Sequence, residues 1–182
     1  ELLKQGGVAD VVLCIGYLGE QIKERLGDGR SLGISIAYSE EKENLLGTAG
    51  AIKQAEPLLR EAFFVLYGDS YLPVNYSEVM RYFLQFDKPA LVVVHKNRDR
   101  WDNSNIIIEG NLVKVYDKVN RTPEMVYIDA GLSVLKKYVL TRIPQGGVMS
   151  LEALYKQLIP QGALLAFETP QRFYEVGSPR GL

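Results

Sequence analysis

A carboxylate stands at a position where it could bind a metal ion. Asp69, within Gly68-Asp69-Ser70, comes shortly after the apolar run 63–66, so it lies at the tip of a predicted strand. Mg²⁺ needs oxygen ligands and is commonly shared between a protein carboxylate and the phosphates of a substrate. An aspartate at this place can also simply cap the following turn, and both interpretations stay open from the residue alone.

Two further segments carry residues that could bind phosphate or metal. Gly47-Thr48-Ala49-Gly50 opens a predicted helix with small residues, whose backbone N–H groups can approach a base, a ribose or a phosphate closely. The same motif is typical of an ordinary helix start with Thr48 as the cap, because short glycine motifs have little specificity. Glu175 follows a strand-like stretch and precedes a glycine turn, where an acid is more often solvated than functional.

These residues need a scaffold of alternating strands and helices. Short apolar runs predict strands at residues 11–15, 63–66 and 90–94, and further strand-like segments lie at residues 34–38, 128–135, 164–167 and 173–176. Helical spacing of apolar residues predicts helices at residues 21–26, 48–59, 76–86 and 151–158. We therefore expect an α/β fold, with a mostly parallel sheet and helices on both faces, plus a small antiparallel hairpin at residues 106–108 and 112–116. Ligands bind such sheets at the carboxyl ends of the strands, where Asp69 lies.

The composition excludes several classes of protein. The chain has 182 residues, 47% of them hydrophobic, and a formal charge of −1, which predicts one globular domain over residues 1–182. Lysines and arginines are scattered among acids, so we expect no nucleic-acid binding. No apolar run approaches the roughly 20 residues that span a bilayer, so we expect no membrane partner.

The cysteine and the histidine of the chain do not indicate nucleophilic catalysis. The only cysteine, Cys14, lies inside the apolar run 11–15, where a buried, reduced thiol is expected, and this favours a cytoplasmic protein. The only histidine, His95, follows the apolar run 90–94 without an identifiable serine or cysteine partner. We therefore expect Cys14 in the core and a structural or solvent-facing role for His95.

Five segments carry a resemblance to a known family. They are VLCIGYLG at residues 12–19, LGTAGAI at 46–52, LYGDS at 66–70, DAGL at 129–132 and YEVGSP at 174–179. In this order they resemble the sugar-phosphate nucleotidyltransferases. The resemblance implies a Rossmann-like, nucleotide-diphospho-sugar transferase-like fold that binds a nucleoside triphosphate and a sugar 1-phosphate side by side. It also implies the activity, in which the sugar phosphate attacks the α-phosphorus, pyrophosphate leaves and Mg²⁺ is the cofactor.

The resemblance assigns the nucleotide and metal side of the site. The substrate-binding residues there are Gly47, Thr48, Ala49, Gly50 and Gly68, of which Gly47, Thr48 and Gly50 would lie against the base and ribose. Asp69 would be catalytic by holding Mg²⁺ together with Glu175. Through the ion, this pair would offset charge that spreads over the transferring nucleotidyl group.

The resemblance also assigns the sugar side. Tyr116-Asp117-Lys118 matches a Glu-Lys segment of the family, so Lys118, the second catalytic candidate, would contact the sugar phosphate and Asp117 a sugar hydroxyl. A solvated lysine at a strand end is the alternative for Lys118. The polar segment 101–105 would overhang the sugar pocket, with Asn105 as its substrate-binding candidate. The residues that would face the sugar ring are Asp129, Ala130 and Gly131.

Three departures from the family pattern alter these expectations. Glu175 stands where aspartate is common, and its extra methylene moves the carboxylate relative to an ion with strict octahedral geometry. Asp129 stands where asparagine is usual, which exchanges an amide donor for an acceptor-only carboxylate and points to a different pattern of sugar hydroxyls. The first strand of the family, with its Gly-rich, Arg-containing loop, is absent. We therefore expect the isolated chain to catalyse poorly and the native product to begin about 40 residues earlier.

Two other functions remain as alternatives. A noncatalytic nucleotide-sugar binding or regulatory domain would result if the loop were lost naturally and Glu175 no longer bound metal. An NAD-dependent oxidoreductase shares the alternation of strands and helices, but the chain lacks a convincing Gly-x-Gly-x-x-Gly after a first strand. The sequence leaves open the base, the sugar and the formation of a homo-oligomer.

Overall fold

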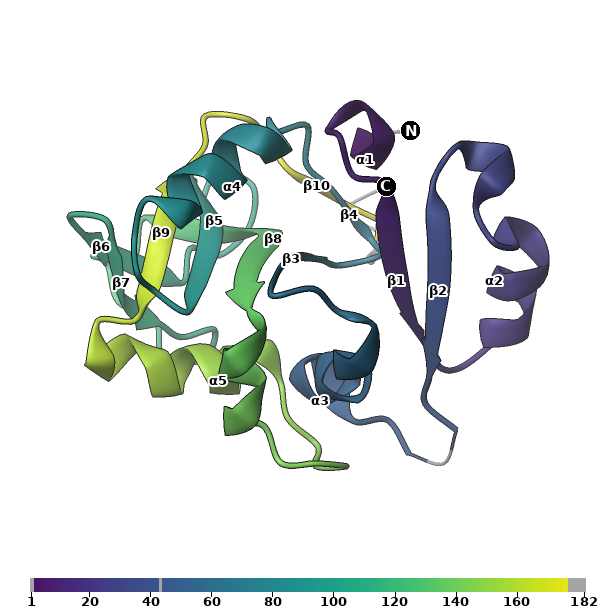
Figure 1. Cartoon of the computed structure of the whole chain (residues 1–182). Coiled ribbons are helices and arrows are strands. Elements are labelled where there is room, and N and C mark those ends of the chain that lie inside the picture. Colours follow the sequence, from purple (N-terminus) through teal and green to yellow (C-terminus); the bar gives the residue numbers. More distant parts are fainter. Residues whose placement is uncertain (1, 43, 177–182) are drawn as a thin grey trace. The chain divides into compact units, whose positions relative to one another are not determined.

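The computed structural model describes residues 2–42 and 44–176 and is drawn in Figure 1. It divides into two compact units, which we describe separately. Unit 1 consists of the described residues up to Glu61 together with Lys137–Leu154. Unit 2 consists of Ala62–Lys136 together with the described residues from Tyr155 onward.

Unit 1 is built around two parallel strands. β1 (Asp10–Ile15) pairs along its whole length with β2 (Ser35–Glu40). α2 (Gly19–Leu26) provides the crossover that parallel neighbours need. The remaining elements are α1 (Leu2–Gln5), α3 (Gly47–Gln54) and three 3₁₀ segments at Arg30–Leu32, Glu56–Leu58 and Lys137–Arg142.

Gly29 lies in the turn that leads the chain from α2 back to β2. Its φ is +81°, and a Cβ there would lie 2.7 Å from the Ile36 side chain and 2.8 Å from the Ile34 carbonyl oxygen. Only glycine accepts both the left-handed backbone and this close approach. The start of β2 is therefore fixed by a glycine whose role the apolar pattern does not reveal.

Cys14 in β1 corrects the expectation of a core position. The residue is exposed, because β1 pairs only with β2 among the described strands and its side chains are incompletely covered. The thiol itself approaches protein atoms and donates to the Ala51 carbonyl oxygen at 3.6 Å. Desolvation, with a smaller contribution from the Glu41 charge, raises the pKa of Cys14 to about 11. The thiol is therefore protonated and unreactive at neutral pH.

Unit 2 contains a six-stranded sheet in the order β3-β8-β5-β9-β7-β6. β6 also pairs with β8 through Ile106 and Tyr127, so the strands from β8 to β6 close into a ring. The strands are β3 (Ala62–Leu66), β5 (Ala90–Lys96), β6 (Ile106–Glu109), β7 (Leu112–Tyr116), β8 (Tyr127–Lys136) and β9 (Leu164–Glu168). A separate ladder joins β4 (Ser70–Tyr71) to β10 (Tyr174–Glu175).

The core of unit 2 lies on β5 and β8, most of whose residues are buried. α4 (Tyr76–Leu84) contacts β5 and β9, and its buried residues Tyr76, Val79 and Phe83 follow helical spacing. Asn75 caps this helix, since its side-chain oxygen accepts a hydrogen bond of 3.1 Å from the Glu78 amide. α5 (Leu151–Leu158) contributes its first residues to unit 1 and its last residues to unit 2.

The expected α/β class is confirmed, but the expected mostly parallel sheet is wrong for unit 2. Among the described strands of its six-stranded sheet, β5 and β9 form the one parallel pair, and β8 runs antiparallel to β3, β5 and β6. The chain reaches β8 from the β6–β7 hairpin through a loop, without the crossover helix that would make it parallel. A strand buried on both faces is mostly apolar whether it runs parallel or antiparallel to its neighbours, so the composition of residues 128–135 does not show the direction of the strand.

The other differences from expectation have local causes. The helix expected at 48–59 ends at Gln54 and gives way to a 3₁₀ turn, because Pro57 lacks an N–H group and disfavours helical backbone at the residue before it. No sequence pattern predicts β4, since two residues are too few to show a period. Within the described part of the chain, no helix combines the length and the apolar character that crossing a membrane requires.

Candidate functional site

The segment 47–50 forms the first turn of α3 in unit 1 and lies against the segment 147–151. The Ala49 and Gly50 amides both donate to the Met149 carbonyl oxygen, at 2.9 and 3.2 Å. Two of the helix-start donors that could serve a ligand are thus already used inside the unit. The protein itself holds this turn in place.

The two glycines of this segment are required by the close approach of the second segment. Gly47 has a φ of +70°, and a Cβ there would lie 2.8 Å from the Met149 carbonyl oxygen. A Cβ at Gly50 would lie 2.6 Å from the Gly147 carbonyl oxygen. Larger residues at either position would push the two segments apart.

Thr48 does not cap its own helix. The N-cap residue of α3 is Leu46, which makes no side-chain cap bond. Thr48 Oγ1 instead accepts a hydrogen bond of 2.8 Å from the Leu151 amide, at the start of α5. The interpretation of Thr48 as an ordinary cap is therefore wrong, and the sequence analysis missed segment 147–151 as its partner.

Asp69 lies between β3 and β4 in unit 2, and β10 runs beside it. Glu175 of β10 stands opposite Ser70, and the Val176 amide donates to the Asp69 carbonyl oxygen at 2.9 Å. Both carboxylates are on exposed residues, and the Ser70 hydroxyl donates to Asp69 Oδ1 at 3.4 Å. The backbones of the two predicted metal ligands are thus neighbours. The rest of the expected motif, residues 177–179, lies outside the described residues.

Gly131 joins β8 to the turn that carries Asp69. Its φ is +82°, and a Cβ there would lie 2.7 Å from Ser70 Oγ. The Tyr67 amide donates to the Gly131 carbonyl oxygen at 3.4 Å, and the Gly131 amide donates to Asp129 Oδ1 at 2.8 Å. Gly131 therefore connects Asp129 with the metal side of the site.

Asp129 is bound to two groups of its own chain. Besides the Gly131 amide, the Tyr116 hydroxyl donates to Asp129 Oδ2 at 2.8 Å. The Tyr116 ring contacts the Tyr155 ring at 5.4 Å between centroids, and the Tyr155 hydroxyl shares a hydrogen bond of 2.6 Å with Ser133. Burial raises the pKa of Asp129, although the two hydrogen bonds oppose the shift. Burial also raises the pKa of Tyr116 far above its ordinary value, so its hydroxyl stays protonated and able to donate.

Asp117 forms a turn directly after β7. Its Oδ1 accepts hydrogen bonds from the Val119 and Asn120 amides at 2.8 and 2.9 Å, and the Asn120 side chain donates to Oδ2 at 3.2 Å. The Asn120 amide and then the Val119 amide lower the pKa of Asp117 to about 2. The carboxylate is therefore charged at neutral pH and keeps lone pairs that could accept a ligand hydroxyl.

Asn105 is buried beside Asp117. Its carbonyl oxygen accepts from the Asp117 amide, and its amide donates to the Tyr127 carbonyl oxygen, both at 2.9 Å. Its side-chain oxygen is buried without a hydrogen-bond partner in the described part of the chain. Such an orphaned acceptor costs about 1–3 kcal/mol, which a ligand hydroxyl would relieve. Lys118 is exposed, with its ammonium 6.0 Å from the Tyr116 ring, and makes no ion pair within the described residues.

The remaining predicted residues differ in what they offer to a ligand. Gly68 is exposed, and a Cβ there would meet nothing within 4 Å. Ala130 is fully buried within β8 and has no free surface in this structure. Unit 2 therefore gathers the metal-side and sugar-side candidates, whereas residues 47–50 belong to unit 1.

Comparison with known proteins decides the family. The family model described as nucleotidyl transferase matches residues 1–141. The chain belongs to the nucleotidyl transferase family. This membership confirms the resemblance on which the assignments of Asp69, Lys118 and Glu175 were based, while the assignments themselves stay predictions.

Several members of the nucleotidyl transferase family are similar to this chain. The mannose-1-phosphate guanylyltransferase catalytic subunit beta of Danio rerio is 27% identical over 186 residues, which cover 99% of this chain and 51% of that protein. The D-glycero-alpha-D-manno-heptose 1-phosphate guanylyltransferase of Campylobacter jejuni is 29% identical over 180 residues, covering 98% of this chain and 78% of that protein. The crystal structure of HddC from Yersinia pseudotuberculosis superposes with a TM-score of 0.79 at 23% identity, covering 99% of this chain and 78% of HddC. The chain thus has the α/β fold of HddC and spans about half the length of the zebrafish relative.

The carboxylates of Asp69 and Glu175 fit a Mg²⁺ ion that is shared with a substrate. In phosphate-transfer sites, this ion is usually bound by one or two carboxylates plus substrate phosphates. Neither acid forms an ion pair within the described residues, so both can accept a cation. In the same part of the chain, no group of three or more His, Cys, Asp or Glu side chains could hold a metal. A Mg²⁺ ion at this place would therefore take its remaining ligands from substrate phosphates and water.

Proposed function

We propose that the protein carrying this chain transfers a nucleotidyl group from a nucleoside triphosphate to a sugar 1-phosphate, releasing pyrophosphate and forming an NDP-sugar. The family match to residues 1–141 carries the proposal. The relatives named as mannose-1-phosphate and heptose 1-phosphate guanylyltransferases support the sugar 1-phosphate as substrate class. The chain covers 51% of the zebrafish relative, so the activity is proposed for the whole protein.

On the nucleotide side, Asp69 and Glu175 would hold Mg²⁺. The bound ion supplies positive charge beside the nucleotide phosphates during transfer. Support comes from the β4–β10 pairing, which aligns the backbones of the two acids. The residues proposed to line the base, ribose and phosphates are Gly47, Thr48, Ala49, Gly50 and Gly68.

On the sugar side, Lys118 would bind the phosphate of the sugar 1-phosphate, and Asp117 and Asn105 would accept hydrogen bonds from its hydroxyls. The support is the permanent charge of Asp117 and the orphaned side-chain oxygen of Asn105. The residues proposed to border the sugar ring are Asp129, Ala130 and Gly131. The two hydrogen bonds of Asp129 to its own chain support a role in shaping this border.

The proposal extends to the organisation and location of the protein. We propose a single Rossmann-like domain over residues 1–182. We also propose a cytoplasmic location without nucleic-acid or membrane partners. The unpaired Cys14, protonated at neutral pH, supports a reducing compartment.

Pyrophosphate release by the full-length gene product tests the activity. The assay combines the common nucleoside triphosphates with hexose and heptose 1-phosphates in the presence of Mg²⁺. We expect turnover with one preferred pair, which would also identify the base and the sugar. Binding of nucleotide or NDP-sugar without turnover of any pair would favour the noncatalytic domain instead.

A matched pair of lysines tests the sugar side. Lys118→Met should raise KM for the sugar 1-phosphate about tenfold or more, because it removes a charged contact to the phosphate. Lys114→Met is the control, since this exposed lysine of β7 pairs with Glu109 outside the candidate site. An equal KM in both variants would contradict the assignment of Lys118.

A further inference from the structure

β10 is too short to hold Glu175 in place by itself. It has two residues, both exposed, and pairs with the equally short β4. An isolated two-stranded ladder is at best marginally stable in water. Other contacts must therefore fix β10.

Arg172 connects β10 to the loop 97–105. Its guanidinium lies 3.8 Å from the centroid of the Trp101 ring and 4.6 Å from that of the Tyr174 ring. Tyr174 in turn contacts Tyr71 of β4, with ring centroids 6.2 Å apart. A planar guanidinium is attracted to aromatic faces both electrostatically and by apolar contact. A row of stacked side chains therefore leads from the loop to the β4–β10 ladder.

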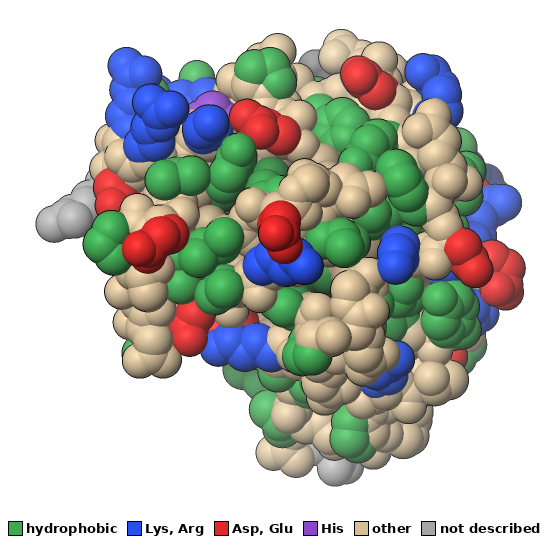
Figure 2. All heavy atoms as spheres, turned by 90° about the vertical axis from the view of Figure 1, so that its left-hand side faces the viewer, with side chains coloured by type: hydrophobic (Ala, Val, Ile, Leu, Met, Phe, Trp, Pro, Cys, Tyr) green, Lys and Arg blue, Asp and Glu red, His purple; other side chains and the backbone are tan. Residues whose placement is uncertain are grey.

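Arg172 depends on these rings because no carboxylate competes for it. Within the described residues Arg172 forms no ion pair. Its neighbour in the chain, Phe173, contacts the His95 ring at 6.5 Å between centroids. Figure 2 shows lysine and arginine side chains beside this single histidine, with an acidic side chain close by. Within the described residues, the aromatic faces of Trp101 and Tyr174 are the groups that hold the Arg172 guanidinium.

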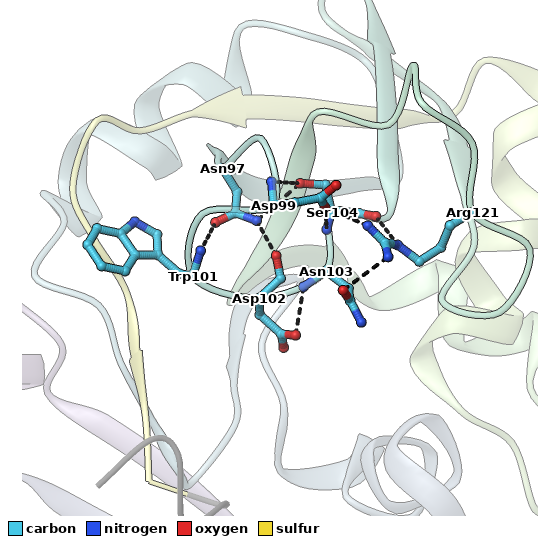
Figure 3. A network of polar contacts seen from close by, with 7 residues as sticks. All are labelled: Asn97, Asp99, Trp101, Asp102, Asn103, Ser104 and Arg121. Carbon is cyan, nitrogen blue, oxygen red and sulfur yellow. Dashed lines mark hydrogen bonds and ion pairs between the residues drawn. The ribbon is translucent and has the colours of Figure 1, made fainter.

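A polar network fixes Trp101 on the loop, as Figure 3 shows. The Trp101 amide donates to Asn97 Oδ1 at 3.0 Å, and Asn97 Nδ2 donates to Ser104 Oγ at 3.1 Å and to the Asp102 carbonyl oxygen at 2.5 Å. Asn97 and Ser104 are both buried. The indole points away from the network, so it is free to stack on Arg172.

Asp99 and Arg121 complete the network. Asp99 Oδ1 accepts from the Ser104 amide at 2.7 Å and pairs with the Arg121 guanidinium, which also donates to the Ser104 carbonyl oxygen at 2.9 Å. The Ser104 amide is the main reason that the pKa of Asp99 is lowered, so its carboxylate stays charged. Arg98 and Asp99 have φ values of +50° and +56°, which non-glycine residues keep only where the surroundings enforce them. The loop is therefore a rigid support for Trp101.

We propose that Trp101 and Arg172 are positioning residues that fix β10 against β4 and so keep Glu175 beside Asp69. This inference rests on the proposed function, in which the two acids hold Mg²⁺. The hydrogen bond from the Val176 amide to the Asp69 carbonyl oxygen exists only while β10 stays in register. Without the stack, β10 separates from β4 and the Glu175 carboxylate leaves the metal site.

Hydrogen exchange of the Val176 amide tests the position of β10 without any catalysis. Trp101→Ala should speed this exchange about two- to fivefold, through the loss of one exposed cation–π contact, and Arg172→Ala, which also loses its contact with Tyr174, should speed it more. Arg100→Ala is the matched control, because its guanidinium lies 4.8 Å from the same indole and belongs to the loop rather than to the segment before β10. Unchanged exchange in Arg172→Ala, or equal acceleration in Arg100→Ala, overturns the proposal. Arg172 is exposed, so its replacement leaves the core intact.

The Mg²⁺ requirement of pyrophosphate release supplies the second readout. Because the ladder is marginally stable, faster opening lowers its paired fraction, so the half-maximal Mg²⁺ concentration should rise in Arg172→Ala by up to the factor by which exchange speeds, and stay unchanged in Arg100→Ala. KM for the sugar 1-phosphate should not change in either variant. Faster exchange with an unaltered Mg²⁺ requirement overturns the proposed role. A parent protein without any turnover contradicts the proposed function instead, and the exchange data still decide whether the stack fixes β10.

Discussion

Two aspartates of unit 2, both predicted to contact the sugar, have contrasting environments. Asp117 accepts hydrogen bonds from two backbone amides in a turn, which lower its pKa to about 2. Asp129 accepts from the Tyr116 hydroxyl and the Gly131 amide, and burial raises its pKa. The surroundings thus favour the charged form of Asp117 and disfavour the charged form of Asp129, although the two side chains are identical.

Residue type alone therefore does not identify a ligand-binding acid. Backbone amides in an open turn stabilise the charged form of Asp117, while the enclosure around Asp129 penalises it. We therefore expect Asp117 to supply negative charge to a ligand and Asp129 to hold Tyr116 and Gly131 in place.

The largest effect is expected from removing the carboxyl group of Asp129. Asp129→Ala leaves the buried Tyr116 hydroxyl without its acceptor and should lower the free energy of unfolding by about 2–3 kcal/mol. Asp129→Asn keeps the shape and both partners, because the tyrosine hydroxyl can turn and accept from the amide, so the loss should stay below about 1 kcal/mol. Urea denaturation measures both values. Equal losses in the two variants would show that charge, rather than the two hydrogen bonds, is what matters at this position.

The pH dependence of stability should have opposite signs for the two aspartates. The pKa of Asp117 falls from 3.8 to about 2 on folding, so its contribution is present above pH 3.8 and is lost as the pH falls toward 2. The folded pKa of Asp129 lies above 3.8, so its contribution is present below pH 3.8 and is lost as the pH rises through the folded value.

Urea midpoints across this pH range separate the two contributions. Relative to the parent, Asp117→Asn should be less stable above pH 3.8, with the gap closing toward pH 2. Relative to the parent, Asp129→Asn should become more stable as the pH rises, because its neutral amide avoids the free-energy cost of an enclosed charge. If the stability difference from the parent changed with pH in the same direction in both variants, the proposed difference between Asp117 and Asp129 would be wrong.

The smallest effect is expected at the ion pair that Asp117 makes with Lys156. The two charged groups are 3.8 Å apart, and the Lys156 side chain is 46% exposed. Lys156→Met should therefore change the free energy of unfolding by less than about 0.5 kcal/mol. A loss comparable with that of Asp129→Ala would mean that the lysine, not the turn amides, determines the state of Asp117.

The local elements could be predicted from the sequence, but the direction of the strands in unit 2 could not. Residues 90–94 are apolar throughout and residues 128–135 are mostly apolar because both strands are largely buried, and burial looks the same in parallel and antiparallel strands. The family resemblance located Asp69 and Glu175, whose backbones the β4–β10 ladder brings together. That ladder itself is too short for any periodic pattern.

The hydrogen-bond partners of the candidate residues could not be predicted from the sequence, and the reason is physical. Tyr116 meets Asp129, and Thr48 meets Leu151, across long separations in the chain that only tertiary folding closes. The Gly146-Gly147 pair before α5 is the one sequence signal of a close backbone approach there. The stack of Trp101 on Arg172 leaves no signal of this kind, because the two residues are far apart in the chain and no local pattern links them.

The most direct test of the account compares two aspartates of unit 2 in pyrophosphate release over a range of Mg²⁺ concentrations. Asp69→Ala should lower kcat by about a hundredfold or more at every Mg²⁺ concentration, because a metal-binding carboxylate is lost. Asp87→Ala is the control, since this exposed carboxylate pairs with Lys136 outside the candidate site, and it should leave turnover unchanged. Parental turnover and an unaltered Mg²⁺ requirement in Asp69→Ala would contradict the assignment of the metal site and with it the proposed mechanism.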